Sequence, residues 1–225
     1  RDWDGNGIIQ TDNKFIRDIN KSRTQCLELN DFYNQNNSDY AWYELLRTYE
    51  SYGDYKESKN KYDFTDMLSH YLEFGPVPIL DVVIVDEAQD LSRLQWRVCE
   101  KIWKNAKRVF ISGDDDQAIF RWAGADVEHL INMDGEVSVL NQSYRCPVEV
   151  HKIAYEISSR IRRRREKVWN PREEEGFVRF HAHPNSVNVG EGNWLIMATC
   201  NYMLEGIERD LRLRGLPYII KGEHP

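Results

Sequence analysis

The stretch "VVIVDEAQD", residues 82–90, joins an apolar run directly to a group of polar side chains. Its first four residues, Val82–Val85, form the short β-branched run that is typical of a parallel strand covered on both faces. Asp86 and Glu87 follow at once. A nucleotide hydrolase places a magnesium ligand in this way, at the end of a buried strand. The stretch therefore predicts an α/β fold with a metal-dependent nucleotide site.

The composition limits the class of protein. With 225 residues, 41% of them hydrophobic and 30% charged, the chain can form one large or two small domains with a real core. A net charge of −7 excludes a wholly basic surface for nucleic acid but allows a local basic groove. No apolar run of about 18 residues is present, so we expect no membrane span. The four cysteines lack zinc-site spacing. A disulfide network is not expected either, which indicates a reducing, cytoplasmic location.

The remaining pattern alternates strands with helices, which indicates a mainly parallel sheet flanked by helices. Apolar spacing and Gly or Pro boundaries predict helices near residues 42–49, 62–75, 92–104, 147–157 and 204–215. Further strands are predicted at residues 108–112, 136–140, 194–198 and 218–220. Polar segments at residues 34–39 and 57–61 are predicted to be loops.

Three of the predicted strands end in unusual polar sequences. The first end carries Asp86, Glu87, Gln89 and Asp90, the second carries "GDDDQ" at residues 113–117, and the third carries "NQSYR" at residues 141–145. Ligands of open parallel sheets sit beyond the carboxyl ends of the strands. An acidic pair alone can end a strand merely because strands end at water. Three such ends in chain order favour one common site.

The side chains at these ends suit phosphoryl transfer. Asp86 can hold magnesium directly or through water, and Glu87 can orient or deprotonate the attacking water. Gln117 can hydrogen-bond the terminal phosphate. Arg145 can neutralise charge on the transferring phosphoryl group, an effect of roughly 10³–10⁵ in rate where it has been measured.

Four motifs make a family resemblance specific. They are "DFTDML" at 63–68, "VVIVDEAQD" at 82–90, "FISGDDDQAIFRWAGAD" at 110–126 and "LNQSYRCP" at 140–147. In order and spacing they resemble consecutive motifs of the UvrD/Rep/PcrA group of superfamily-one DNA helicases. The segments "VWNPREEEGFVRFHA" and "WLIMATCNYMLEGIERDLRLRGLPYIIKGE" resemble the same group, so the likeness extends from about Lys61 to the end of the chain.

The resemblance implies a P-loop NTPase fold with RecA-like motor domains. Residues 1–60 would form a helical insertion in the first motor domain. Residues 61–139 would form part of that domain, with its Walker B and GDxxQ motifs, and residues 140–225 part of the second. The activity implied is ATP-dependent movement on single-stranded DNA with duplex unwinding. ATP and Mg²⁺ would be the cofactors, and the partners would be single-stranded DNA, duplex junctions and possible accessory replication or repair proteins, with no membrane.

The resemblance also assigns roles to residues of the nucleotide site. Asp86 and Glu87 would be the magnesium ligand and the catalytic base, and Gln117 would couple the γ-phosphate to the DNA track. Tyr144 would stack on the adenine, and Arg145 would act as an arginine finger from the second motor domain.

The DNA track would be formed by "FRW", where Phe120 and Trp122 stack on bases and Arg121 lies between them. Core packing is the alternative explanation for the two rings. The family usually has arginine where this chain has Ala123, so one DNA contact of the family is not expected here. The family also usually has arginine at or near Thr199.

No G-x-x-x-x-G-K-[ST] phosphate loop occurs in the 225 residues. The last motifs of the second motor domain of that family are missing too. We therefore expect a central excerpt of a longer motor, with the loop upstream of Arg1, and no hydrolysis by the excerpt alone. The alternative is a non-hydrolysing DNA-binding or scaffold protein on a helicase framework. A helicase-nuclease relative is a third possibility.

Three other features have simpler explanations. Residues 2–13 resemble a calcium loop, but Asn13 stands where the bidentate Glu is needed, which favours a polar turn. The basic run at residues 160–167 is expected to be the solvated end of a helix rather than a phosphate contact. Asp63 and Asp66 are expected to serve in N-capping or surface solvation.

Overall fold

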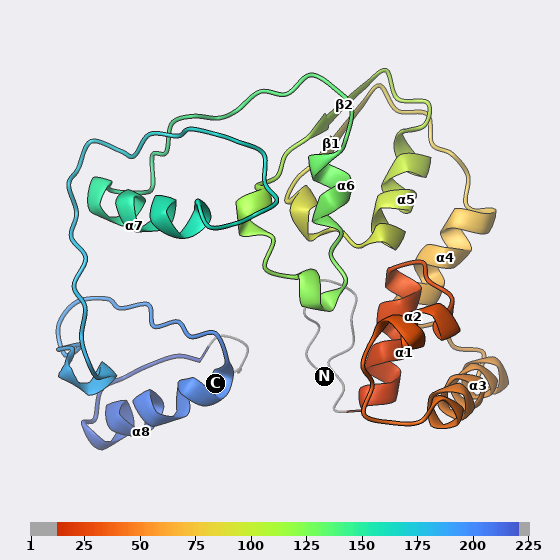
Figure 1. Ribbon diagram of the computed structural model, residues 1–225, viewed down its shortest axis with the longest axis horizontal. Helices are drawn as coiled ribbons and strands as arrows, with labels where there is room; N and C mark the ends of the chain where they lie inside the picture. The colour runs from red at the N-terminus through yellow and green to blue at the C-terminus, as the bar shows by residue number, and fades with distance from the viewer. Residues whose placement is uncertain (1–12, 221–225) are drawn as a thin grey trace. The chain divides into compact units, whose positions relative to one another are not determined.

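The computed structural model describes residues 13–220, which divide into two compact units (Figure 1). The first unit comprises residues 13–141 and 156–168, and the second comprises residues 142–155 and 169–220. Most of the calcium-loop-like stretch lies outside the described residues. No helix within 13–220 combines the length and the apolar character that crossing a membrane requires.

The first unit begins with four helices: α1 (Lys14–Thr24), α2 (Leu29–Gln35), α3 (Trp42–Ser58) and α4 (Phe64–Phe74). Ile19, Tyr40 and Leu45 form their small core. The helices predicted near 42–49 and 62–75 are confirmed, with Gly75 capping the end of α4. Since α3 runs to Ser58, the loop predicted to begin at residue 57 starts two residues later.

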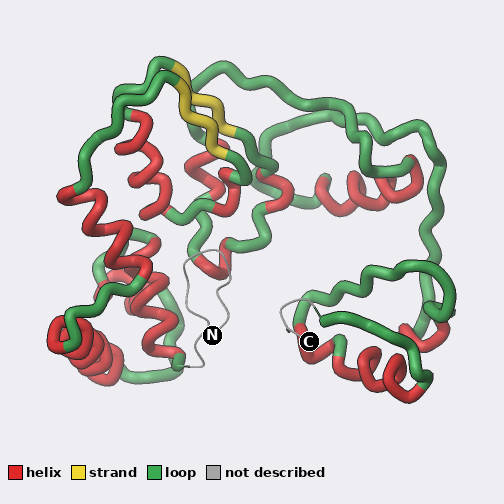
Figure 2. The backbone as a smooth tube through the Cα atoms, turned by 180° about the vertical axis from the view of Figure 1, so that it is seen from behind, coloured by secondary structure: helices red, strands yellow, loops and turns green. Residues whose placement is uncertain are grey.

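A β–α–β crossover follows. Strand β1 (Val82–Val85) leads into α5 (Arg93–Trp103), and strand β2 (Arg108–Ile111) returns parallel to β1, with Val82 opposite Arg108. The two strands lie side by side in Figure 2. Ser92 caps α5 by accepting a hydrogen bond from the Gln95 N–H, and the helix buries Trp96 completely. Both strands and the helix were predicted from the sequence, but the expected cover on both faces of β1 is wrong, since Val82 and Ile84 are 48% and 73% exposed. The first unit continues through the short helix α6 (Val127–Ile131).

The strands predicted at residues 136–140, 194–198 and 218–220 are wrong, because these segments have irregular backbone. Leu140, Leu195 and Ile219 are 89%, 80% and 93% exposed. A strand needs a hydrogen-bonded neighbour, and within residues 13–220 the sheet consists of β1 and β2 alone. Apolar β-formers without such a neighbour stay irregular, so the described fold is mixed α/β, mostly helical, with a two-stranded parallel sheet.

The second unit contains most of α7 (Val148–Ser158) and all of α8 (Glu205–Leu213). The predicted helix begins at Pro147, whereas α7 begins one residue later, at Val148. Beyond α8, Gly215 adopts a positive φ of 66°, as expected for a residue that stops a helix. The four cysteines carry free thiols.

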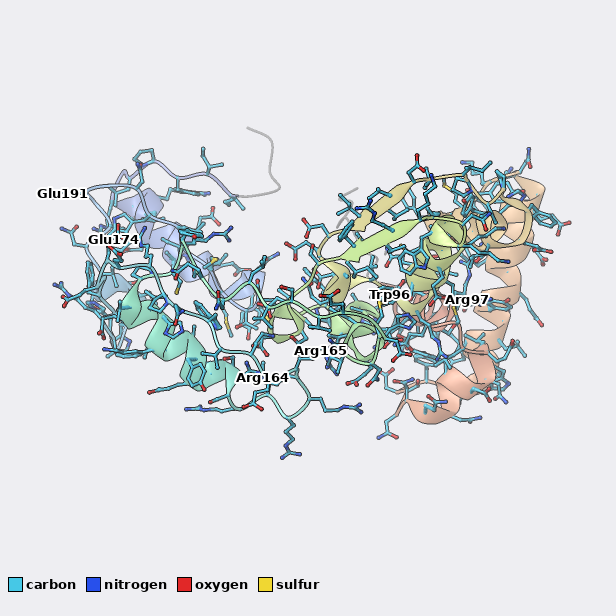
Figure 3. All side chains as sticks on the ribbon, turned by 90° about the horizontal axis from the view of Figure 1, so that it is seen from above. Trp96, Arg97, Arg164, Arg165, Glu174 and Glu191 are labelled. Atoms are coloured by element: carbon cyan, nitrogen blue, oxygen red, sulfur yellow. The ribbon has the colours of Figure 1, made fainter. Side chains whose placement is uncertain are left out.

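The basic run does not form a solvated helix end, so that expectation is wrong. Helix α7 ends at Ser158, and the following segment packs within the first unit (Figure 3). The side chains of Arg164 and Lys167 are only 14% and 15% exposed, because both are paired with aspartates. Ion pairs of Arg164 and Lys167 with aspartates distant in sequence hold this segment in place.

Asp63 and Asp66 meet one of their two expected roles and not the other. The N-capping prediction is confirmed, since the Asp63 side chain accepts a hydrogen bond from the Asp66 N–H at 2.7 Å. Surface solvation is wrong: the Asp63 side chain is 6% exposed and pairs with Arg23 at 2.7 Å and Lys56 at 2.9 Å. These pairs join α1, α3 and α4.

Candidate functional site

The carboxyl ends of β1 and β2 are fixed to each other. The Ser112 N–H, just beyond β2, donates to the Val85 carbonyl at 2.8 Å, and the Ala88 N–H donates to the Ser112 carbonyl at 3.0 Å. The ladder thus continues past the strands into the loops that carry the polar motifs. The side chains singled out at these two ends therefore belong to adjacent loops at one edge of the sheet.

Asp86 presents an ionised carboxylate at this edge. Its Oδ1 atom accepts hydrogen bonds from the Ser112 hydroxyl at 2.5 Å and the Glu87 N–H at 3.0 Å. These bonds, the Ser112 bond first, lower the pKa of Asp86 below its ordinary value. The residue is exposed, and hard divalent cations prefer such oxygen ligands. Asp86 therefore fits a magnesium ligand.

Glu87 is held in an unusual conformation. Its backbone has φ 52° and ψ 39°, a left-handed geometry that is uncommon for residues other than glycine. Its carboxylate accepts a hydrogen bond from the Gln89 side-chain amide at 2.7 Å. Burial, together with the nearby charge of Glu87, raises the pKa of Asp90. Backbone and side chain thus both fix the direction of the Glu87 carboxylate.

Gln89 links the two strand ends, a role that sequence reasoning missed. It is 2% exposed, and its Oε1 atom accepts the Asp114 N–H at 3.0 Å while its Nε2 atom donates to Glu87. A Cβ atom at Gly113 would lie 2.8 Å from this Oε1 atom. The available signals were a glutamine inside the first polar run and the glycine that opens "GDDDQ".

Gln117 lies on the neighbouring loop. Its Nε2 atom donates to the Asp114 carboxylate at 2.5 Å, and its own N–H donates to the Asp114 carbonyl at 2.9 Å. The structure therefore brings Asp86, Glu87 and Gln117 onto adjacent loops. Hydrogen bonds through Gln89 and Asp114 connect the last two.

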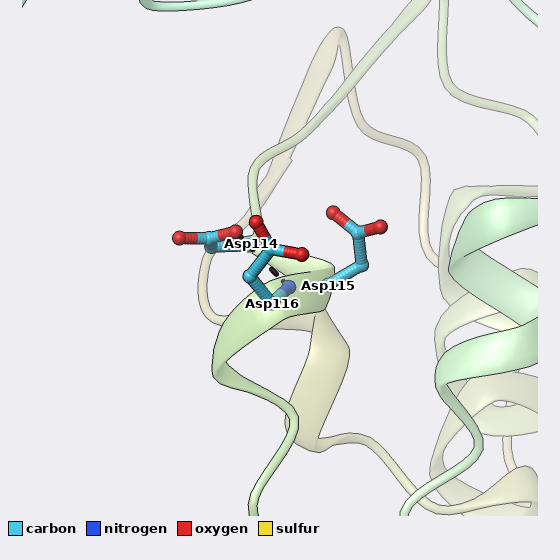
Figure 4. A group of neighbouring side chains, drawn as sticks. All are labelled: Asp114, Asp115 and Asp116. Atoms are coloured by element: carbon cyan, nitrogen blue, oxygen red, sulfur yellow. Dashed lines mark hydrogen bonds between the residues drawn. The ribbon is translucent and has the colours of Figure 1, made fainter. Parts of the chain in front are cut away.

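The three aspartates of "GDDDQ" form an acidic cluster, hereafter the triad: Asp114, Asp115 and Asp116 (Figure 4). One carboxylate oxygen from each lies within 4.8 Å of the others. The Lys167 ammonium contacts all three, at 2.9 Å from Asp114 and 3.2 Å from Asp116, with a short contact to Asp115. The chain itself therefore neutralises the triad, which does not carry the features of a free metal site.

The aromatic residues after the triad lie near each other. The ring centroids of Phe120 and Trp122 are 6.5 Å apart, at an interplanar angle of 49°. Trp122 is 63% exposed, whereas Phe120 is half-buried. Arg121 is exposed and lies 3.5 Å from Glu128. Core packing therefore does not account for Trp122, and stacking on DNA stays a prediction for both rings.

Tyr144 and Arg145 are exposed in the second unit, Tyr144 to 86%. Their turn is held by Ser143, whose hydroxyl accepts the N–H groups of Arg145 at 3.3 Å and Cys146 at 3.0 Å. Because they belong to a different unit from Glu87, the predicted approach of these side chains to the hydrolytic residues stays a prediction.

Comparison with known proteins shows similarity to one protein family. Residues 6–138 match the model of the UvrD/REP helicase N-terminal domain. The chain is 27% identical over 158 residues to the ATP-dependent DNA helicase PcrA of Bacillus subtilis (strain 168), which covers 62% of this chain and 21% of that protein. It is 28% identical over 152 residues to DNA helicase II of Haemophilus influenzae, with the same shares covered.

Similarity also extends into the second unit. The chain is 22% identical over 254 residues to the ATP-dependent DNA helicase Rep of Buchnera aphidicola subsp. Baizongia pistaciae, which covers 95% of this chain and 37% of that protein. The chain thus spans between 21% and 37% of the length of these three relatives. The family resemblance seen in the motifs is confirmed.

Proposed function

Because this chain belongs to the UvrD/REP helicase N-terminal domain family, we propose that it is part of an ATP-dependent DNA helicase or translocase. Its residues 61–139 would contribute to a first RecA-like motor domain, residues 1–60 a helical insertion, and residues 140–225 part of a second motor domain. The parallel β1–α5–β2 crossover, with polar motifs at both carboxyl ends, supports this assignment.

The hydrolytic roles follow from the chemistry of the strand ends. Asp86, ionised and exposed, would hold Mg²⁺. Glu87 would accept a proton from the attacking water, in the direction set by its hydrogen bond from Gln89. Gln117 would donate a hydrogen bond to the terminal phosphate of ATP. Bound Mg²⁺ would neutralise charge on the phosphate oxygens.

Two residues of the second unit complete the proposed nucleotide site. Tyr144 would stack on the adenine, for which its exposed ring is suited. Arg145 would neutralise the charge that develops on the transferred phosphoryl group. The Ser143 hydroxyl supports both roles by holding the backbone of their turn.

Single-stranded DNA would bind along "FRW". Base stacking on aromatic rings contributes about 1–3 kcal/mol per base and tolerates any sequence, which suits a moving protein. The exposure of Trp122 and its proximity to Phe120 support a stacking platform, and Arg121 supplies positive charge beside it. Duplex junctions would be the second DNA partner.

One observation carries most of this proposal: Gln89 hydrogen-bonds Glu87 on one loop and the Asp114 N–H on the other. A buried amide in this position holds the proposed base in register with the loop of Gln117. Such pre-orientation is what a hydrolytic site needs, since positioning dominates the catalysis of phosphoryl transfer.

An ATPase assay on the full-length protein, with and without single-stranded DNA, tests the proposal. We expect DNA-stimulated hydrolysis that falls by about 10²–10⁴-fold in Glu87→Gln, which removes the base but keeps the shape of the side chain. Glu57→Gln, an exposed position on α3, is the matched control and should hydrolyse ATP normally. DNA binding without hydrolysis would instead favour a non-hydrolysing DNA-binding or scaffold protein.

A further inference from the structure

Lys167 lies against the triad although it is 52 residues from Asp115 along the chain. Its ammonium contacts one carboxylate oxygen of each aspartate, and its side chain is 15% exposed. Three carboxylates this close repel one another in the absence of a cation. Lys167 is therefore the cation shared by all three carboxylates, and the only other side-chain cation paired with the triad among the described residues is Arg164, at Asp116.

The segment around Lys167 is fixed independently of that ammonium. The Arg165 N–H donates to Asp115 at 2.6 Å, and the Arg165 guanidinium donates to the carbonyls of Ile131 at 2.7 Å and Met133 at 3.0 Å. Arg164 pairs with Asp116 at 2.9 Å. Lys167 thus reaches the triad from a segment that has its own anchors, so its geometry is set by more than one contact.

Asp114 connects Lys167 to the proposed hydrolytic residues. Its Oδ1 atom lies 2.9 Å from the Lys167 ammonium, while its Oδ2 atom accepts the Gln117 amide at 2.5 Å. Its backbone N–H donates to Gln89, which in turn donates to Glu87. A single hydrogen-bonded path therefore runs from Lys167 to Gln117, with a branch to Glu87.

We propose that Lys167 is a positioning residue for ATP hydrolysis, acting through Asp114 to fix the direction of the Gln117 side-chain amide. The inference rests on the proposed function of Gln117. Without the ammonium, repulsion from Asp115 and Asp116 displaces the Asp114 carboxylate or favours its protonated form. In either case the carboxylate no longer holds the Gln117 side-chain amide. Lys167 itself touches neither the nucleotide nor DNA in this scheme.

Two measurements test the inference. In the 225-residue chain, NMR follows the Gln117 side-chain amide, identified by its disappearance in Gln117→Glu. Lys167→Met should shift this signal and speed its hydrogen exchange, whereas Lys167→Arg should restore it. In the full-length protein, Lys167→Met should lower kcat about tenfold with an unchanged KM for ATP, and Lys167→Arg should recover kcat.

Arg163→Met is the matched control, because Arg163 lies in the same basic segment but pairs with Glu128 and is 65% exposed. It should change neither measurement. If Lys167→Met fails to fold, Lys167→Gln takes its place in both measurements, because this substitution removes the charge but keeps a hydrogen-bond donor.

An unchanged Gln117 signal in the neutral variant would overturn the inference, as would a shifted signal with normal kcat. A wild-type protein without ATPase activity would instead contradict the proposed function. The NMR comparison would then still decide whether Lys167 positions Gln117.

Discussion

The Oε1 atom of Gln89 accepts the backbone N–H of Asp114 at 3.0 Å, across the ends of two parallel strands. The same side chain donates to Glu87 at 2.7 Å. Both polar ends of this buried amide are therefore occupied, one on each loop. Removing the amide breaks two hydrogen bonds at once and frees the proposed base.

Gln89→Leu should destabilise the chain by about 1–3 kcal/mol, because the partly buried Asp114 N–H loses its hydrogen-bond partner. Urea unfolding of the purified chain measures this loss. Gln35→Leu, at the exposed end of α2, is the control and should shift stability by no more than about 0.5 kcal/mol. Equal stability of the two variants would show that the Gln89 bonds contribute nothing.

Gly113→Ala should also destabilise the chain, for a steric reason. The added Cβ would lie 2.8 Å from the Gln89 Oε1 atom and 3.2 Å from its backbone nitrogen, so a buried, hydrogen-bonded side chain must move. Gly53→Ala is the matched control: it adds the same methyl group inside α3, with no atom within 4 Å.

The control should gain about 0.5–1 kcal/mol, the usual benefit of alanine over glycine within a helix. The two substitutions are thus expected to change the melting temperature in opposite directions. A stabilised Gly113→Ala variant would contradict the close packing described for Gln89.

Local pattern was enough to predict the part of the fold that carries the site. The β-branched run Val82–Val85 and the helical spacing of apolar residues after Ser92 specify β1 and α5 from neighbours in sequence. Asp86 and Glu87 could be located at a strand end for the same reason. The strand predicted at residues 194–198 does not form, because a strand also depends on a partner strand that local sequence does not reveal.

Contacts between distant segments could not be predicted. Arg23 and Asp63 are 40 residues apart, and Lys167 and Asp115 are 52 apart. Charged residues in isolation are usually solvated, so the sequence allowed solvation for Asp63 and favoured it for the basic run that contains Lys167. Only the folded chain pairs them, and burial then follows from the pairing.

Asp63→Asn should lower the stability of the helical region by about 2–3 kcal/mol at pH 7. Asparagine is an equally good N-cap residue, so α4 keeps its start while the contacts of the charge with Arg23 and Lys56 are weakened. Asp39→Asn is the control, since the Asp39 side chain is 80% exposed in its pair with Lys14, and it should have no measurable effect on unfolding.

The stability of the wild type and that of Asp63→Asn should also respond differently to pH. Burial raises the pKa of Asp63, but hydrogen bonds from Arg23, the Asp66 N–H and Lys56 outweigh it and hold the pKa well below its ordinary value. The unfolded chain takes up this proton near pH 4, before the folded one does. The stabilising contribution is therefore complete above about pH 4 and declines as the pH falls toward the folded pKa.

Urea unfolding at pH 7 and pH 3 checks this behaviour. The stability difference between wild type and Asp63→Asn should shrink at pH 3. A difference that stays constant or grows at low pH would show that the Asp63 charge does not stabilise the fold.

The 225-residue chain alone should not hydrolyse ATP, because it contains no G-x-x-x-x-G-K-[ST] loop to hold the phosphates. Phosphate release by the purified chain, measured with and without single-stranded DNA, checks this. The Glu87→Gln chain gives the background rate. Release above that background would mean that other residues bind the phosphates.

Trp122→Ala should weaken binding of single-stranded DNA by about 1–3 kcal/mol, the contribution of one stacked base. Because Trp122 is 63% exposed, its loss should leave the melting temperature nearly unchanged. Fluorescence anisotropy with a labelled oligonucleotide measures the affinity. Tyr43→Ala, an aromatic residue on α3 that is 70% exposed, is the control and should bind DNA as wild type does. If both variants bind equally well, Trp122 is not part of the DNA track.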